Sequence, residues 1–97
     1  MLDVCVLAVI KNGPSYGYKI INELKEYIDI AESTLYPILR RLETNGNLIT
    51  YSQQTGGRIR KYYKITASGI ARIARFVDDW QELIKIYQFI KEHGGYN

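Results

Sequence analysis

The last third of the chain carries an apolar seam with the spacing of a coiled coil. Its members recur at alternating steps of three and four residues, the a and d positions of a heptad repeat. They are Ile70, Ile73, Val77, Trp80, Ile84 and Tyr87. A second apolar stripe runs beside the seam through Phe76, Leu83 and Ile90. Because such a helix can pack on its own domain and on a second helix, the pattern predicts a homodimer; packing of both stripes within one monomer is the alternative.

The first segment also holds more apolar surface than a chain of 97 residues can easily bury. Residues 4–10 are all apolar, and Gly13-Pro14 ends the run. We expect residues 2–12 to form a helix that is buried on every side, which calls for a partner chain. A buried strand is the competing interpretation of so short a run. The predicted dimer interface combines both segments: Leu2, Val6, Val9, Ile70, Ile73, Val77, Trp80, Ile84 and Tyr87.

Two further helices are predicted before the middle of the chain. Ser15 is predicted to cap a second helix that ends near Tyr27. Gly17 costs such a helix about 1 kcal/mol relative to Ala, and we expect the close approach of another backbone to require it. A third helix is predicted over residues 32–45, which Asn45-Gly46 ends. Its buried stripe is Leu35, Ile38, Leu39 and Leu42.

A hairpin and a last helix complete the chain. Residues 48–54 and 58–65 are predicted strands on either side of a Thr55-Gly56-Gly57 turn. Thr66 is predicted to cap the last helix, which ends near His93. The order of helix, helix, helix, strand, strand, helix is typical of a winged helix-turn-helix with one appended helix.

The predicted fold is therefore mainly α with a two-stranded wing. The length suffices for one domain and is too short for two. We assign residues 1–65 to a winged helix-turn-helix and residues 66–97 to a C-terminal dimerisation helix, in one compact unit.

Positive charge gathers in the middle of the chain. The whole chain has a net charge of +3, and residues 31–65 alone carry six Lys and Arg against two Glu, a net +4. Residues 1–30 carry a net −1, and residues 66–97 are neutral. A polyanionic partner would be met in the middle segment.

The third helix and the hairpin supply the residues for such a partner. The outward side of the helix presents hydroxyls and arginines, which can contact phosphates and base edges in double-stranded DNA. These residues are Ser33, Thr34, Tyr36, Pro37, Arg40, Arg41 and Thr44. The hairpin adds Arg58, Arg60, Lys61 and Lys64, which suit the phosphate backbone or the minor groove. The competing interpretation of both surfaces is an ordinary solvated face.

Trp80 lies in the middle of the seam and is the only tryptophan. Close to a two-fold axis, two indoles could enclose a flat aromatic molecule, because aromatic faces stack favourably. Trp80, Val77 and Ile84 are the candidate effector-binding residues. Filling of the dimer core by Trp80 is the alternative.

The sequence offers little for catalysis. The single His and the single Cys form no zinc site, and no glycine-rich phosphate loop is present. We therefore expect no metal, no cofactor and no enzymatic activity. No run of about 18 apolar residues and no signal peptide are found, so we expect no membrane contact. The single cysteine, Cys5, cannot form an internal disulfide, which indicates a reduced, cytoplasmic protein.

Three motifs stand out along the chain: Gly13–Tyr18 reads GPSYGY, Ser33–Glu43 reads STLYPILRRLE, and Gly57–Thr66 reads GRIRKYYKIT. With these motifs in this order, the chain resembles the PadR family of bacterial transcriptional regulators over nearly its whole length. The resemblance implies a dimeric winged-helix repressor of palindromic operators, and the short C-terminal helix resembles the smaller subfamily. Family members often control detoxification or efflux genes, and some release DNA when a phenolic acid or drug binds. Some small members hold flat aromatic drugs between tryptophans of this helix, and Trp80 stands at such a position.

The same resemblance implies which side chains face DNA. Matched position by position, these are Tyr18, Lys19, Ser33, Thr34, Tyr36, Arg40 and Arg41. Ala31-Glu32 departs from the small polar residue and proline of many members. Glu32 suits a helix N-terminus but weakens phosphate contact there. The rival function is a protein-interaction module that has lost DNA binding, which the basic middle segment disfavours.

Overall fold

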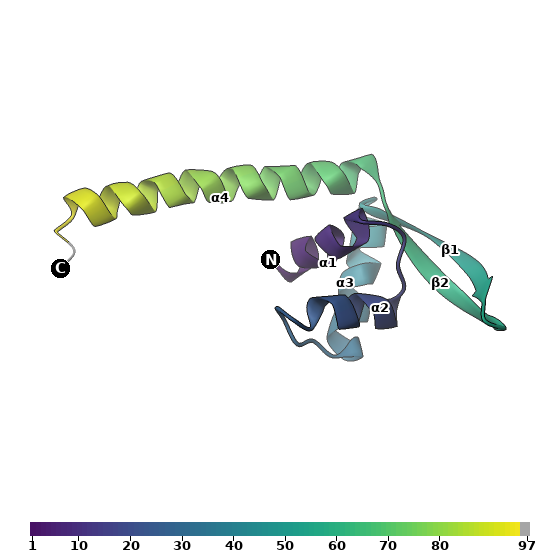
Figure 1. The fold of residues 1–97 in the computed structure, drawn as a ribbon. Helices are drawn as coiled ribbons and strands as arrows, with labels where there is room; N and C mark the ends of the chain where they lie inside the picture. The colour runs from purple at the N-terminus through teal and green to yellow at the C-terminus, as the bar shows by residue number, and fades with distance from the viewer. Residues whose placement is uncertain (96–97) are drawn as a thin grey trace.

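The computed structural model describes residues 1–95, and its six elements follow in the predicted order (Figure 1). The prediction of a mainly helical fold with a two-stranded wing and a long last helix is confirmed. The helices are α1 (Leu2–Lys11), α2 (Gly17–Leu24), α3 (Glu32–Thr44) and α4 (Ala67–His93), and the wing consists of strands β1 (Leu48–Thr55) and β2 (Arg58–Ile65). Residues 96–97 of the predicted dimerisation segment lie outside the described residues, and the domain boundary at 65/66 stays a prediction.

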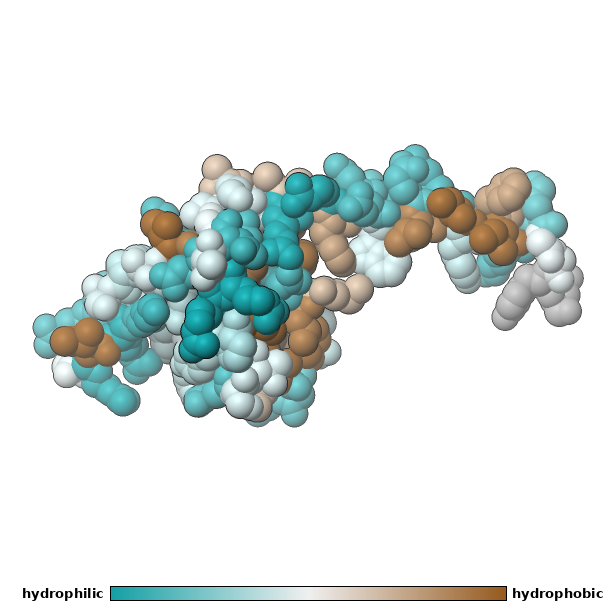
Figure 2. All heavy atoms as spheres, turned by 180° about the vertical axis from the view of Figure 1, so that it is seen from behind, coloured by the Kyte–Doolittle hydropathy of each residue, from teal (hydrophilic) through white to brown (hydrophobic). Residues whose placement is uncertain are grey.

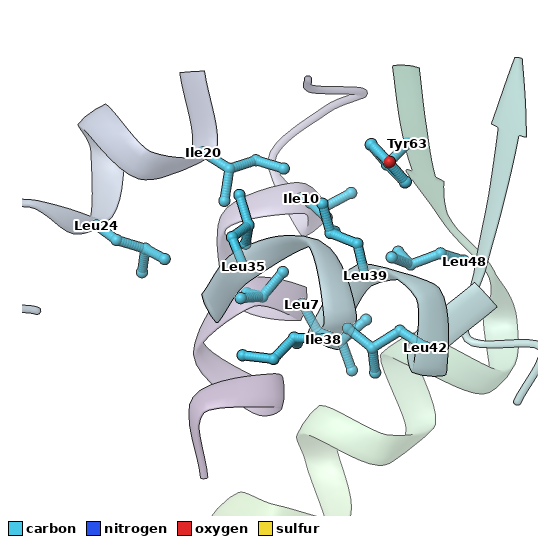
Figure 3. Close-up of a cluster of buried hydrophobic side chains, with 11 residues drawn as sticks. Leu7, Ile10, Ile20, Leu24, Leu35, Ile38, Leu39, Leu42, Leu48 and Tyr63 are labelled. Atoms are coloured by element: carbon cyan, nitrogen blue, oxygen red, sulfur yellow. The ribbon is translucent and has the colours of Figure 1, made fainter. Parts of the chain in front are cut away.

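The core forms where α3 packs against α1. The stripe predicted for α3 is buried, with Leu35, Leu39 and Leu42 at most 1% exposed, and its leucines face Leu7 and Ile10 of α1 (Figure 3). The remaining core residues come from α2 and the base of the wing, and they are Ile20, Leu24, Leu48 and Tyr63.

Helix α1 is partly covered in the single chain. The competing strand interpretation is wrong, since residues 2–11 are helical. We expected α1 to need a partner chain to bury all of its sides. Instead, Val6, Leu7 and Ile10 are buried in the same chain, while Leu2 and Val9 are half-buried. Val6 has no exposed surface, so it belongs to the core of the monomer and was wrongly assigned to the dimer interface.

Ser15 does not cap α2. The N-cap residue is Tyr16, and the helix ends at Leu24 rather than near Tyr27. Ser15 instead pairs with Tyr63 of β2: its N–H donates to the Tyr63 carbonyl at 3.0 Å, and the Tyr63 N–H donates to the Ser15 carbonyl at 2.7 Å. This bridge fastens the wing to the body, and a residue held in it is not free to begin the helix.

The wing is tighter at its tip than predicted. Thr55 pairs with Arg58, so it belongs to β1 and only Gly56 and Gly57 form the turn. Both glycines have positive φ, 59° and 78°. Two-residue turns of this kind match the right-handed twist of the strands, and they favour residues without a Cβ atom.

A polar joint fixes the direction in which α4 leaves the body. Thr66 caps α4 as predicted, accepting a hydrogen bond from the Gly69 N–H at 3.1 Å. Buried Asn47 donates to the Ser68 hydroxyl at 3.0 Å and accepts from Arg72 at 3.2 Å. Arg72 also pairs with Asp3 at the start of α1. These contacts join the loop between α3 and β1, and the start of α1, to the first turns of α4.

The remainder of α4 projects beyond the body (Figure 1). Every described side chain from residue 77 onward is exposed. The radius of gyration is 17.0 Å, compared with about 13 Å for a compact chain of this length. The seam therefore lies open in a single chain. No helix within residues 1–95 combines the length and the apolar character needed to cross a membrane.

Candidate nucleic-acid interface

Three adjoining hollows lie between the wing and helices α2 and α3. They are about 260, 210 and 360 Å³ in volume and follow one another from the base of the wing to its tip. Each shares lining residues with the next, so together they form one concave surface, which we call the wing trough. Its lining residues are Tyr16, Gly17, Tyr18, Tyr36, Arg40, Glu43, Arg58, Ile59, Arg60, Lys61 and Tyr63. Tyrosine and basic side chains dominate, a composition that suits a polyanion.

Helix α3 contributes Tyr36 and Arg40 to the wing trough. Ser33, Thr34 and Arg41 are exposed as well, but they line none of the hollows. Arg41 is 100° around the helix from Arg40, on the side away from Tyr36. The predicted residues of α3 thus divide into Tyr36 and Arg40, which line the wing trough, and Ser33, Thr34 and Arg41, which do not.

Helix α2 contributes Tyr18, whose side chain is 63% exposed. Lys19 is exposed and lies 3.9 Å from Glu23 on the next turn. Gly17 is required for a different reason from the one predicted. A Cβ atom there would lie 2.3 Å from the hydroxyl of Tyr36, so a side chain rather than another backbone approaches it.

Three of the four predicted basic residues of the wing line the wing trough, and they differ in how they are held; the fourth, Lys64, is exposed and lines none of the three hollows. Arg58 is exposed at the tip. Arg60 lies with its guanidinium 4.5 Å from the centre of the Tyr16 ring. The Lys61 ammonium is 3.9 Å from Glu43 and 5.6 Å from the centre of the Tyr63 ring. All three line the wing trough.

Sequence reasoning missed Tyr16, Tyr63 and Glu43 as members of this surface. Glu43 accepts a hydrogen bond from the Thr50 hydroxyl at 3.0 Å, which places its carboxylate between α3 and the wing. Burial, together with Tyr36 and Glu43 nearby, raises the pKa of Tyr63 above its ordinary value. The tyrosine-rich GPSYGY and KYY motifs were the available signal, because the Ser15–Tyr63 bridge brings the two together.

The candidate dimer and effector residues of α4 are open in the single chain. Trp80 is 42% exposed, and Val77 and Ile84 are exposed beside it along the helix. Figure 2 shows apolar side chains along the part of α4 that extends past the body. The other seam residues are exposed or half-buried: Ile70, Ile73 and Tyr87. Ile86 and Phe89, on the opposite side of the helix from the seam, are 54% and 62% exposed and were not predicted.

An apolar hollow of about 360 Å³ lies between α1 and α2, away from the wing trough. Its walls include Val9, Leu24 and Ile28, with the half-buried thiol of Cys5 among them. Within residues 1–95, no group of His, Cys, Asp and Glu side chains could hold a metal ion.

Residues 6–75 match the sequence model of the transcriptional regulator PadR-like family. An uncharacterised protein X of Lysinibacillus sphaericus is 33% identical over 96 residues, which cover 94% of this chain and 88% of that protein.

Solved structures share the fold. The crystal structure of smu.1704 from Streptococcus mutans is 38% identical with a TM-score of 0.82, covering 99% of this chain and 91% of that chain. Bacillus subtilis PadR, solved in complex with operator DNA, is 23% identical with a TM-score of 0.73, covering 79% of this chain and 46% of that chain. At 23% identity, the similarity to Bacillus subtilis PadR supports the fold alone.

Proposed function

The chain belongs to the PadR-like family of transcriptional regulators, and from that premise we propose that it is a repressor that binds a palindromic operator as a homodimer. The family consists of regulators, so the prediction of a protein without enzymatic activity is confirmed. The wing trough carries the proposal, because tyrosine and basic side chains from α2, α3 and the wing meet in one concave surface. Such a regulator would work in the cytoplasm, where the chromosome is.

The wing trough suits one strand of a DNA duplex. With the N-terminal part of α3 in the major groove and the wing over the adjacent minor groove, a phosphodiester strand would lie between them. Arg40 and Lys61, on opposite walls, would then contact its phosphates. Ser33 and Thr34, at the start of α3, would meet base edges. Bacillus subtilis PadR, which shares the fold, is bound to operator DNA.

The exposed part of α4 supports the homodimer. Its seam and the added Ile86 and Phe89 leave apolar side chains on most sides of the last turns, more than one neighbouring helix covers. A second copy offers two apolar surfaces, its own α4 seam and the hollow between α1 and α2. The symmetric pair would hold two α3 helices about 34 Å apart, one turn of B-DNA.

Removing one basic residue from each wall of the wing trough will weaken DNA binding and lower its dependence on salt. We expect Arg40→Ala and Arg58→Ala each to reduce affinity about tenfold. The slope of log affinity against log salt should fall by roughly 0.9 for each lost phosphate contact. Fluorescence anisotropy with labelled DNA from upstream of the protein's own gene measures both quantities.

Lys85→Ala is the matched control for this pair. It removes the same charge from α4, where Lys85 pairs with Glu82 far from the wing trough. If the Arg40 and Arg58 variants behave as the control does, the proposed surface is wrong. A wild-type protein without any salt-dependent DNA binding would favour the protein-interaction module.

We also propose that a planar aromatic or phenolic effector binds between the two copies of Trp80 and releases the DNA. Val77 and Ile84 would form the apolar floor of that site, and effector binding would shift the separation of the α3 helices. Planar aromatic compounds should quench the fluorescence of Trp80, the only tryptophan, and shift the anisotropy midpoint for DNA in the same concentration range. Absence of quenching across a panel of such compounds would leave Trp80 as a packing residue of the dimer.

A further inference from the structure

A column of aromatic rings connects the wing to the start of α2. Tyr51 of β1 stacks on Tyr62 of β2, with ring centres 5.5 Å apart and planes 11° from parallel. Tyr62 meets the ring of Tyr16 edge to face at 5.4 Å and 73°. The guanidinium of Arg60 lies 4.5 Å from the centre of the Tyr16 ring and closes the column. Four residues from three elements therefore form one continuous contact.

The geometry leaves Arg60 able to bind a further group. A guanidinium that packs near an aromatic ring by its face keeps its N–H groups at the edge of the plane. Within residues 1–95, no carboxylate pairs with Arg60, whereas Lys61 beside it lies 3.9 Å from Glu43. Arg60 also lines two of the three hollows of the wing trough. Among the described residues, the N–H groups of the Arg60 guanidinium therefore have no carboxylate partner, and they lie on the wall of the wing trough.

Tyr16 itself is firmly placed. It is the N-cap residue of α2, and its neighbour Ser15 is bridged to Tyr63 by two backbone hydrogen bonds of 3.0 and 2.7 Å. Tyr62 supports the ring from the other side. A ring fixed in this way can hold a long, flexible side chain in one orientation.

We propose that Tyr16 is a positioning residue that holds Arg60 for contact with a DNA phosphate in the wing trough. The inference rests on the proposed function, and it adds Tyr16 as a residue that affects DNA binding through Arg60. Holding the guanidinium in advance lowers the entropy lost when the complex forms. Because the contact is with phosphate, its effect is the same on every DNA sequence.

A double-mutant cycle tests the proposal. The probe is a labelled duplex of random sequence, with binding followed by anisotropy over a salt series. We expect Tyr16→Leu to weaken binding by about fivefold to tenfold and Arg60→Gln to weaken it by at least as much, because a desolvated cation–π contact and a charged phosphate contact are of this order. In the Arg60→Gln background, Tyr16→Leu should change nothing further. Tyr16→Phe, which keeps the ring, should bind as the wild type does.

A structural role for Tyr16 predicts a different outcome. Its loss would then weaken binding by the same factor with Arg60 or with Gln at position 60, and that result would overturn the proposal while leaving DNA binding intact. Failure of Tyr16→Phe to restore affinity would overturn it as well. If Tyr16→Leu does not fold, Arg60→Lys provides the test, because this change lies on the wing and conserves the charge. The proposal requires that Arg60→Lys also lowers affinity. A wild-type protein that binds the duplex without salt dependence would overturn the proposed function itself.

Discussion

Ile84→Asp will convert the protein from a dimer into a monomer and weaken binding to operator DNA by roughly 10²–10⁴-fold. Ile84 is 48% exposed in the single chain and lies one turn from Trp80 on the seam. A dimer would bury its side chain against the partner helix, and a carboxylate in that position would lose its water without gaining a partner. The large loss at the DNA follows because two joined half-sites bind as one unit, while a monomer holds each separately.

Lys85→Asp provides the control, because it puts the same carboxylate on the neighbouring residue, 100° further around the helix and away from the seam. Sedimentation equilibrium should report a dimer for the control and a monomer for Ile84→Asp. Anisotropy with upstream DNA should report near wild-type affinity only for the control. The monomer should also lose helical circular dichroism, because nothing in its own chain covers α4 from residue 77 onward. A dimeric Ile84→Asp protein would show that the seam is not the interface.

The parts of the fold that the sequence predicts well are those that local signals determine. The leucine stripe of α3 follows from helical spacing, and Thr66 and Asn45-Gly46 mark helix boundaries that need no distant contact. The heptad seam is similarly local. It was found as a pattern of residues, and the exposure of Val77 and Trp80 in the single chain agrees with it.

Residues whose positions depend on distant partners were predicted poorly. Serine is a residue type that commonly caps helices, but the bridge of Ser15 to Tyr63, nearly fifty residues away, outweighs that preference. Asn47 reads as an ordinary turn residue after Gly46, yet it joins Ser68 and Arg72 across the start of α4. The basic character of the hairpin predicts that Arg60 belongs to the candidate surface. Its cation–π contact with Tyr16 depends on how the wing packs against the start of α2, which the sequence does not show.

Gly69→Ala will destabilise the protein by about 2 kcal/mol, because the added methyl group has nowhere to go. An ideal Cβ atom at Gly69 would lie 2.5 Å from the backbone carbonyl oxygen of Asn47 and 2.7 Å from the side chain of Ile65. The Asn47 carbonyl cannot move away at low cost, since it accepts the Thr66 N–H at 3.1 Å in the joint that directs α4. The gain of about 1 kcal/mol in helix propensity offsets only part of this cost. We expect the melting temperature to fall by about 8–16 °C.

Gly17→Ala separates this clash from a general effect of adding a methyl group to a buried helical glycine. Its Cβ atom would meet the far end of the Tyr36 side chain at 2.3 Å, and a tyrosine ring can rotate away where a backbone carbonyl cannot. We therefore expect its melting temperature to stay close to that of the wild type. Its DNA affinity should drop, because Tyr36 leaves its place on the wall of the wing trough.

Thermal melts and anisotropy on both variants should give opposite patterns: Gly69→Ala loses stability, and Gly17→Ala loses DNA affinity at unchanged stability. Equal melting temperatures for the two would mean that α4 shifts to accommodate the methyl group, and that the joint at Asn47 is softer than its hydrogen bonds imply.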